Sequence, residues 1–182
     1  MLTDIDKVVI DRDFFNSFMR LDLKNIRKGK GRVEQFLKWQ SIYGGYISVP
    51  NEYTIFELLD FMETVQIELN DICKKLSKLS PTNAIPHEII DLLLDFYKKN
   101  FEFYFDENSQ QVSMREIDNR YLTIYDIRGY CLREILKAHK ISHLGQCEQC
   151  GCFYISKRTA TKVCSASCRT KKASDKKIGK EN

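Results

Sequence analysis

The spacing of apolar residues predicts that most of this chain is helical. The strongest signal covers residues 54–79, where apolar side chains recur every three or four positions, as they do along one face of an α-helix. Thr54, with Glu57 three residues later, fits a capping box at the start of this helix. The Ser80-Pro81 pair is typical of a helix end.

The same spacing predicts two more helices, at about 86–99 and about 121–138. Between them, residues 101–106 (FEFYFD) alternate aromatic and acidic side chains at the start, and an apolar pattern resumes at 112–117 (VSMREI), which predicts a strand pair. Apolar groups at helical spacing also occur near the N-terminus, at Phe14, Phe15, Phe18 and Leu21 and again at Val33, Phe36 and Leu37. The pattern therefore predicts an α+β fold with a mostly helical N-terminal domain over residues 1–140.

Charge is distributed unevenly along the 182 residues. The net charge is only +4, yet residues 147–182 contain nine Lys or Arg and three acidic residues, while residues 1–146 contain 20 basic and 22 acidic residues. A near-neutral body therefore carries a basic C-terminal segment, and such a segment is typical of a module that binds phosphate groups.

Cysteine usage and the N-terminus indicate a reducing compartment. Five of the seven cysteines lie between positions 147 and 168, whereas a secreted disulfide protein would spread an even number along the chain. The first residues, MLTDIDKVVIDRDFF, carry acids where a signal peptide carries basic residues, and no stretch approaches the ~18 apolar residues of a membrane span. We therefore expect a cytoplasmic protein with no membrane partner, whose clustered cysteines bind a metal.

The cysteine cluster has the spacing of a structural zinc site. Cys147-x2-Cys150 is followed, after thirteen residues, by Cys164-x3-Cys168. Four cysteines can surround one Zn²⁺ as a tetrahedron, and Gly151 allows the tight turn of a zinc knuckle, in which backbone N–H groups face the sulfur atoms. The predicted ligands of one structural Zn²⁺ are Cys147, Cys150, Cys164 and Cys168.

The residues around these cysteines predict the local fold of the site. Phe153–Ile155 and Thr161–Val163 are strand-like and flank a polar, basic turn, so a short hairpin is expected between the two cysteine pairs. The sequence after Cys164 favours a helix, on which Cys164 and Cys168 share one face of the first turn. Knuckle, hairpin and helix in this order define a treble clef, so residues 141–182 are predicted to form a four-cysteine treble-clef zinc finger with a basic C-terminal helix.

Two alternatives for the cysteines remain open. Cys152 could replace Cys150 as a ligand, although that choice would misplace Gly151 within the turn. Some of the clustered cysteines could instead be buried apolar residues or a redox pair. Cys73 and Cys131 lie on apolar helix faces, and we expect them to be core residues.

The segment CEQCGCFYISKRTATKVCSASCRTKKAS resembles the CGNR-type zinc finger. The matching positions are Phe153, Ser156, Arg158, Cys164, Cys168, Arg169, Lys172 and Ala173. The namesake Cys-Gly-Asn-Arg is replaced here by Cys168-Arg-Thr-Lys. The resemblance implies a helix-rich ABATE-like domain before the finger, in a bacterial protein of stress-linked transcription regulation whose finger contacts DNA.

No residue pattern indicates an enzyme. Four cysteines leave no open position on the metal for water or substrate. The chain lacks a Gly-rich phosphate loop, a nucleophile elbow and a metal-binding His pair. His139 and His143 precede the knuckle and could in principle serve a nuclease centre, but packing or surface positions are the commoner role of such histidines.

The function predicted from charge is nucleic-acid binding, and together with the family resemblance this predicts a DNA-binding transcription regulator. The predicted contact residues are the basic side chains of the finger: Lys157, Arg158, Lys162, Arg169, Lys171, Lys172 and Lys176. Tyr154 is a candidate for a stacking contact. The alternative function is a protein–protein interaction module with a structural zinc finger. A third interpretation is that the lysines only form a soluble basic tail. A small-molecule effector and a homodimer are further candidate partners of the aromatic-rich body.

Overall fold

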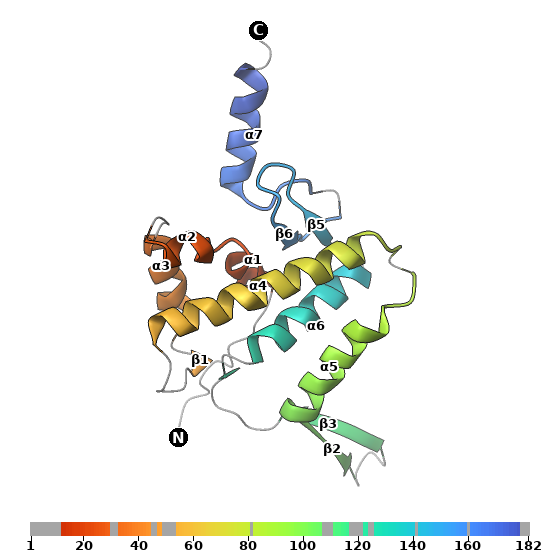
Figure 1. Ribbon diagram of the computed structural model, residues 1–182. Coiled ribbons are helices and arrows are strands. Elements are labelled where there is room, and N and C mark those ends of the chain that lie inside the picture. The colour runs from red at the N-terminus through yellow and green to blue at the C-terminus, as the bar shows by residue number, and fades with distance from the viewer. Residues whose placement is uncertain are drawn as a thin grey trace, which may run out of the picture.

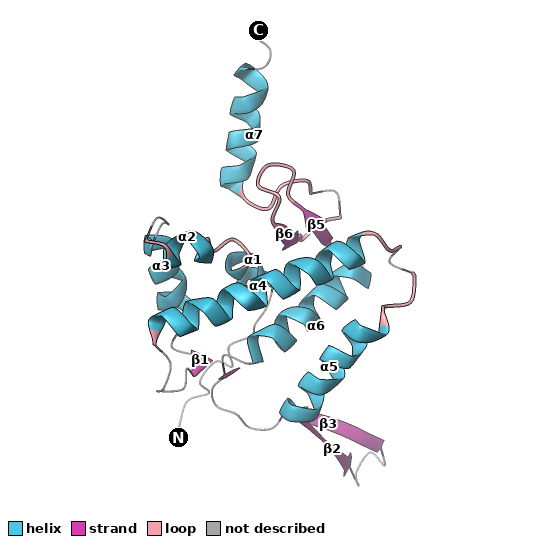
Figure 2. Ribbon diagram, in the orientation of Figure 1, coloured by secondary structure: helices cyan, strands magenta, loops and turns pink. Residues whose placement is uncertain are grey.

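The protein is mostly helical in its computed structural model, which describes residues 12–29, 33–44, 47–48, 54–80, 82–106, 111–116, 122–123, 126–140, 142–159 and 161–178. Within these residues the chain forms seven helices and three two-stranded sheets (Figure 2). This composition confirms the predicted α+β class with a predominance of helix. None of the described helices combines the length and apolar character that crossing a membrane requires.

The helices and strands follow one another along the chain, as Figure 1 shows. The helices are α1 (Arg12–Phe18), α2 (Leu23–Arg27), α3 (Val33–Tyr43), α4 (Ile55–Ser77), α5 (His87–Asn100), α6 (Asp126–Lys140) and α7 (Ala166–Ile178). The strands are β1 (Ile47–Ser48), β2 (Phe101–Asp106), β3 (Gln111–Glu116), β4 (Leu122–Thr123), β5 (Leu144–Gln146) and β6 (Phe153–Ile155). β1 pairs with β4 in parallel, whereas β2 with β3 and β5 with β6 are antiparallel pairs.

Helix α4 has the start that its sequence predicts. The Thr54 hydroxyl accepts a hydrogen bond from the Glu57 backbone N–H at 3.3 Å, and the Glu57 carboxylate accepts one from the Thr54 N–H at 2.8 Å. These reciprocal bonds satisfy two donors that the first helical turn leaves unpaired. The predicted capping box is confirmed, and so are the predicted helix near 86–99 and the strand pair that follows it.

The core of the body lies between α1, α4 and α6. Leu69 and Leu76 of α4 and Leu132 of α6 are fully buried, and so are three phenylalanines of α1. The predicted core cysteines, Cys73 and Cys131, are fully buried as well, which confirms their assignment. Burial of this apolar surface is the main stabilising contribution to such a body.

Short α1 is held in place by its aromatic neighbours and by α4. The Phe14 ring lies 5.6 Å from the Trp39 ring and meets the Tyr43 ring edge-on at 5.0 Å, so α1 and α3 share an aromatic contact. On the other side, the Gln66 side-chain amide donates to the backbone oxygens of Phe18 at 2.5 Å and Leu21 at 3.1 Å. These contacts fix the position of α1 relative to the rest of the body.

Two features of the body differ from the sequence predictions. The third long helix begins at Asp126 rather than near 121, because Leu122 and Thr123 form β4 and pair with the distant β1. Helix α2 was not predicted, since its residues lie in a polar, basic stretch, but Leu23 and Ile26 are buried and anchor it. In both cases a non-local contact outweighs the local pattern.

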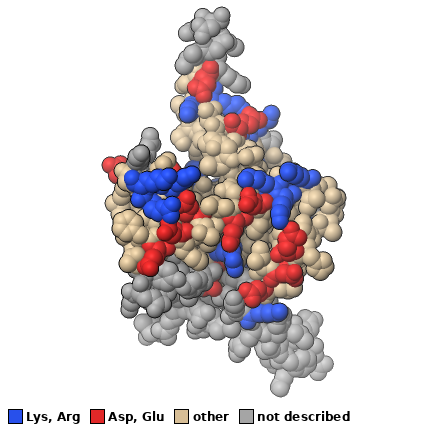
Figure 3. Space-filling view, in the orientation of Figure 1, with Lys and Arg blue, Asp and Glu red and all other residues tan. Residues whose placement is uncertain are grey.

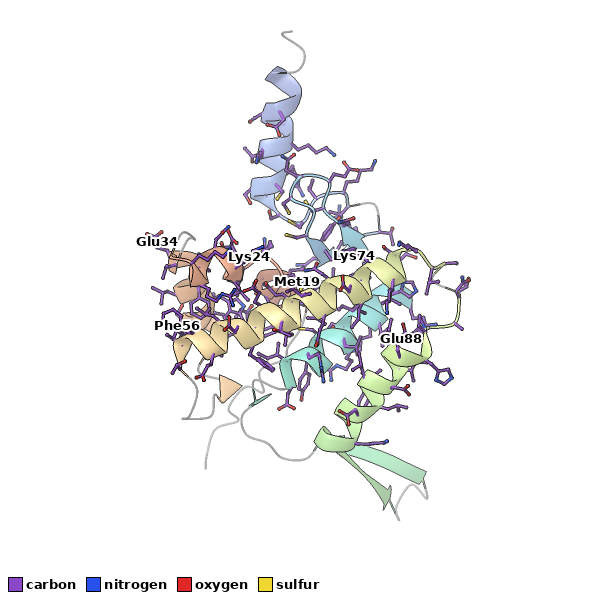
Figure 4. The ribbon with its side chains drawn as sticks, viewed as in Figure 1. Met19, Lys24, Glu34, Phe56, Lys74 and Glu88 are labelled. Atoms are coloured by element: carbon purple, nitrogen blue, oxygen red, sulfur yellow. The ribbon has the colours of Figure 1, made fainter. Side chains whose placement is uncertain are left out.

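Figure 1 shows how the C-terminal part is arranged on the body. The β5–β6 hairpin lies against the body, near the C-terminal end of α4, and α7 projects away from it. Phe153 and Ile155 of β6 are buried in the same core as the helices. The side chains in Figure 4 place Lys74 near the hairpin end of α4 and Phe56 at the opposite end of this helix.

Candidate metal centre

Strand pairing builds the first half of the metal centre. β5 and β6 pair with Leu144 opposite Ile155 and Gln146 opposite Phe153, so residues 147–152 form the turn that connects them. The Cys147 N–H donates to the Cys152 oxygen at 2.9 Å, and the Gly151 N–H donates to the Cys147 oxygen at 2.9 Å. The turn therefore holds the Cys147-x2-Cys150 pair at the end of a hairpin.

Gly151 has the backbone conformation that the knuckle requires. Its φ is +73°, in the left-handed region that side chains other than glycine rarely adopt. The Gln146 side-chain amide donates to the Gly151 oxygen at 2.9 Å and supports this turn. The predicted role of Gly151 in the knuckle agrees with this geometry.

The start of α7 builds the second half. Ser165 precedes the helix, and its hydroxyl accepts a hydrogen bond from the Cys168 N–H at 3.2 Å, as an N-cap residue does. Cys164 therefore lies just before the helix and Cys168 within its first turn. Their Sγ atoms lie 3.6 Å apart.

The structure brings the four predicted cysteines together. All four Sγ atoms, of Cys147, Cys150, Cys164 and Cys168, lie within 4.8 Å of one another, close enough to hold one metal ion. The Cys150 and Cys164 Sγ atoms are 3.6 Å apart. A tetrahedral zinc with Zn–S bonds of about 2.3 Å has sulfur–sulfur edges of about 3.8 Å, so these residues fit the metal.

The environment of the cluster favours the thiolate of Cys147 but not those of Cys150 and Cys164. Burial opposes ionisation of Cys147, but hydrogen bonds from the backbone N–H groups of Cys164, Cys150 and Gln149 outweigh it and lower the pKa of Cys147 to about 6. Burial raises the pKa of Cys150 and raises that of Cys164 to about 11. A divalent metal ion would displace the protons of these two thiols and offset two of the four negative charges of the thiolates.

Cys152 lies outside the four-cysteine group. Its thiol points toward the Cys150 backbone oxygen, at 3.9 Å, and it is absent from the set of mutually close sulfur atoms. The alternative in which Cys152 replaces Cys150 as a ligand is therefore disfavoured by geometry.

The predicted hairpin between the cysteine pairs is wrong. Phe153–Ile155 does form a strand, but it pairs with the preceding segment, Leu144–Gln146. Thr161–Val163 forms no strand. The latter segment is instead held by single contacts: the Glu148 N–H donates to the Lys162 oxygen at 3.1 Å, and the Tyr154 hydroxyl donates to the Thr161 oxygen. β6 prefers β5 because this pairing buries Phe153 and Ile155 against the body.

One polar contact with the body was missed by sequence reasoning. The Asn16 side chain of α1 donates to the Ile155 oxygen at 2.8 Å and accepts from the Ile155 N–H at 2.7 Å. Asn16 thereby satisfies one residue of the β6 edge as a neighbouring strand would. No signal in the sequence links residues 139 positions apart, so only the structure could reveal this pair.

The predicted basic contact residues occupy different surroundings. Lys157 and Arg158 are exposed beside the finger loop, and Arg169 and Lys171 are exposed on α7. Lys162 and Lys172 instead face Glu148 of the knuckle, whose pKa is lowered first by the hydrogen bond from Lys172. Lys176 belongs to α7, but its side chain lies outside the described residues.

Charges over the rest of the visible face are mixed. Figure 3 shows Lys and Arg side chains over α2 and over the end of α4 near the finger, with acidic side chains between them. Arg27 of α2 pairs with Asp60 of α4, and Lys75 of α4 pairs with Glu88 of α5 at 2.8 Å. In the described part of this face, acidic side chains therefore interrupt the basic ones.

Tyr154 and the two histidines do not behave as exposed functional groups. Tyr154 is buried, with 2% of its surface exposed, so it is not available for stacking on a base. His139 is buried, and burial lowers its pKa; its Nε2 atom has no hydrogen-bond partner among the described residues. Neither His139 nor His143 belongs to the group of residues that could hold a metal.

Fold and site together define a class: a mostly helical body that carries, near its C-terminal end, four cysteines placed closely enough to hold one metal ion. Comparison adds no closer assignment, since no protein-family model, no curated protein and no solved structure matches this chain.

Proposed function

We propose that the protein is a zinc-binding, DNA-binding transcription regulator whose finger contacts nucleic acid. The proposal rests on one observation: four cysteine sulfurs within 4.8 Å of one another clamp a loop and a helix that carry exposed basic side chains. Zinc is the metal we assign, because an all-cysteine tetrahedral set is typical of structural zinc sites. The zinc holds the finger together and takes no part in chemistry, so we propose no enzymatic activity.

We further propose that residues 141–182 form a variant treble clef. A knuckle at the end of a β-hairpin and a helix that supplies the second cysteine pair support this reading. The family resemblance to the CGNR-type finger, with an ABATE-like domain before it, agrees with the order of the two parts. The domain division at residue 140 and the cytoplasmic location are parts of the same proposal.

Four basic residues are the best candidates for phosphate contacts: Lys157, Arg158, Arg169 and Lys171. Each is exposed, and among the described residues none of the four has an acidic group within ion-pair distance. Contacts between such side chains and the phosphate backbone release counterions, so binding of this kind weakens as the salt concentration rises.

The experiment is a binding titration of the zinc-loaded protein with duplex DNA at several salt concentrations. We expect affinity to fall steeply between low and moderate salt, and an Arg158→Gln/Arg169→Gln double variant to bind more weakly and with a shallower salt slope. Metal analysis of the same sample should give about one Zn²⁺ per chain. Absence of duplex binding at low salt by the metal-loaded protein overturns the nucleic-acid proposal and favours the protein-interaction alternative.

A further inference from the structure

Glu148 of the knuckle forms ion pairs with two lysines. Its Oε1 atom lies 3.7 Å from the Lys162 Nζ atom, and its Oε2 atom contacts the Lys172 Nζ atom. Lys162 comes from the segment before Cys164, and Lys172 comes from the second turn of α7. The three residues belong to three segments that the four-cysteine centre holds side by side.

The two ammonium groups are arranged as they would be around a phosphate. Each approaches a different oxygen of one carboxylate, and a phosphodiester group presents two anionic oxygens in a similar way. The position is accessible from the side of Lys162, because 46% of the Glu148 side chain and 74% of the Lys162 side chain are exposed, against 28% of the Lys172 side chain. Exposed ion pairs contribute little to stability, so an external anion can displace Glu148 at small cost.

From this arrangement we infer that Lys162 and Lys172 form an additional subsite for a nucleic-acid phosphate, which the Glu148 carboxylate occupies in the free protein. The inference rests on the proposed function and sharpens it. The exposed Arg158 and Arg169 bind first, and the Lys162–Lys172 subsite opens when a phosphate replaces Glu148. A polyanion whose phosphate groups do not enter this subsite leaves Glu148 in place, and the negative charge of Glu148 then weakens its binding.

A neighbouring acid supplies a matched control. Asp175 lies on the same helix as Lys172, and its carboxylate accepts a hydrogen bond from the Gln149 side-chain amide at 2.9 Å; among the side chains that the structure describes, no lysine pairs with it. Glu148→Gln and Asp175→Asn therefore change the net charge equally, but only the first frees two ammonium groups.

The first experiment compares duplex DNA binding of these two variants at fixed zinc content. We expect Glu148→Gln to raise affinity about three- to tenfold and to steepen the slope of log K against log salt by about one to two, while Asp175→Asn changes the affinity less than about twofold. Equal effects of the two variants would show that only net charge matters and would overturn the inference.

The second experiment is a double-mutant cycle. Lys172→Gln should weaken binding by the wild-type protein less than binding by the Glu148→Gln variant, because in the wild type the phosphate contact is partly offset by loss of the Glu148–Lys172 pair, and it should remove most of the gain in the Glu148→Gln background. A loss of the same factor in both backgrounds contradicts a subsite closed by Glu148. If Glu148→Gln fails to fold, the wild-type background still tests the inference. A loss of DNA affinity on Lys172→Gln as large as the loss on Arg169→Gln overturns it.

An inorganic probe separates the subsite from the proposed function. If no variant binds duplex DNA, the proposed function fails. The subsite is then judged by NMR titration of the Glu148→Gln and wild-type proteins with inorganic phosphate. Shifts at the Lys162 and Lys172 side chains that are stronger in the variant support the subsite, and identical titrations overturn it.

Discussion

The body and the finger are stabilised in different ways. In the body, α1, α4 and α6 contribute fully buried side chains, such as Phe15, Leu69 and Leu132. In the finger, the buried side chains belong to the hairpin and face the body or the sulfur atoms, and no residue of α7 is buried among those described. The body can therefore fold by burying apolar surface, whereas we expect the knuckle and α7 to depend on a metal held by the four cysteines.

The largest effect that distinguishes the two regions should follow from loss of a ligand. Cys164→Ser removes one of four sulfurs, so we expect bound zinc to fall from about one to near zero per chain and residues 147–177 to lose protection in hydrogen exchange, while the long helices remain folded. The measurements are metal analysis and hydrogen exchange by mass spectrometry. Cys152→Ser is the matched control and should retain the metal. If Cys152→Ser loses zinc and Cys150→Ser keeps it, the ligand set is different from the one proposed.

The converse change is a substitution in the core of the body. Leu132 is fully buried in α6. Leu132→Ala should lower the free energy of unfolding by about 2–5 kcal/mol through lost burial and a residual cavity. Chemical denaturation monitored by circular dichroism gives this value. Zinc stoichiometry of the folded variant should not change, and a loss of zinc from the folded variant would show that the two regions are one cooperative unit.

The junction between the regions should show a smaller effect. Asn16→Ala removes both hydrogen bonds to Ile155 and leaves part-buried backbone groups of β6 without this partner. We expect a loss of about 1–3 kcal/mol and faster hydrogen exchange at Ile155. Asn16→Asp keeps an acceptor for the Ile155 N–H but loses the donor, so it should slow exchange relative to Asn16→Ala. Identical exchange in the two variants would contradict the role of the Asn16 acceptor.

The smallest expected effect concerns the cap of α4. Thr54→Ala removes the hydroxyl that caps this helix and should cost about 1 kcal/mol in a denaturation experiment. The pKa of Glu57 is lowered, first by its hydrogen bond to the Thr54 backbone. A lowered folded-state pKa means that the stabilisation is complete above the unfolded pKa and is lost as pH falls through the folded value. Thr54→Ala keeps this backbone bond but removes a second bond to the same carboxylate, which the Thr54 hydroxyl donates at 2.8 Å. The part of the cost that comes from this second bond should shrink in acid, and a cost that is independent of pH would show that only the Glu57 N–H bond to the hydroxyl contributes.

Local sequence was sufficient wherever the contacts are local. The capping box at Thr54 and Glu57 and the regular apolar spacing of α4 could be predicted, because both depend on residues three or four positions apart. The strand pair β2–β3 was predictable for the same reason, since its strands lie close together in the sequence. The spacing of the four cysteines likewise predicted that they converge, and the structure brings them together.

Prediction failed where two segments compete for one strand, and where a strand pairs with a segment far away in the sequence. Phe153–Ile155 could pair with Thr161–Val163 or with Leu144–Gln146, and the local pattern permits both. The start of α6 was misplaced in the same way, since Leu122 and Thr123 pair with β1 across the chain. For β6 the choice depends on which pairing buries Phe153 and Ile155 against the body, and that quantity belongs to the packed molecule.

The sequence by itself therefore determined the helical class of the body, the cap of its longest helix and the four sulfurs of a metal centre, because regular spacing and residue chemistry are local properties. Only the tertiary structure decided that β6 joins the body core, that Asn16 completes its edge, and that Glu148 faces Lys162 and Lys172. These three features depend on chain segments brought together by folding. Burial and charge can select among partners only once those segments are in contact.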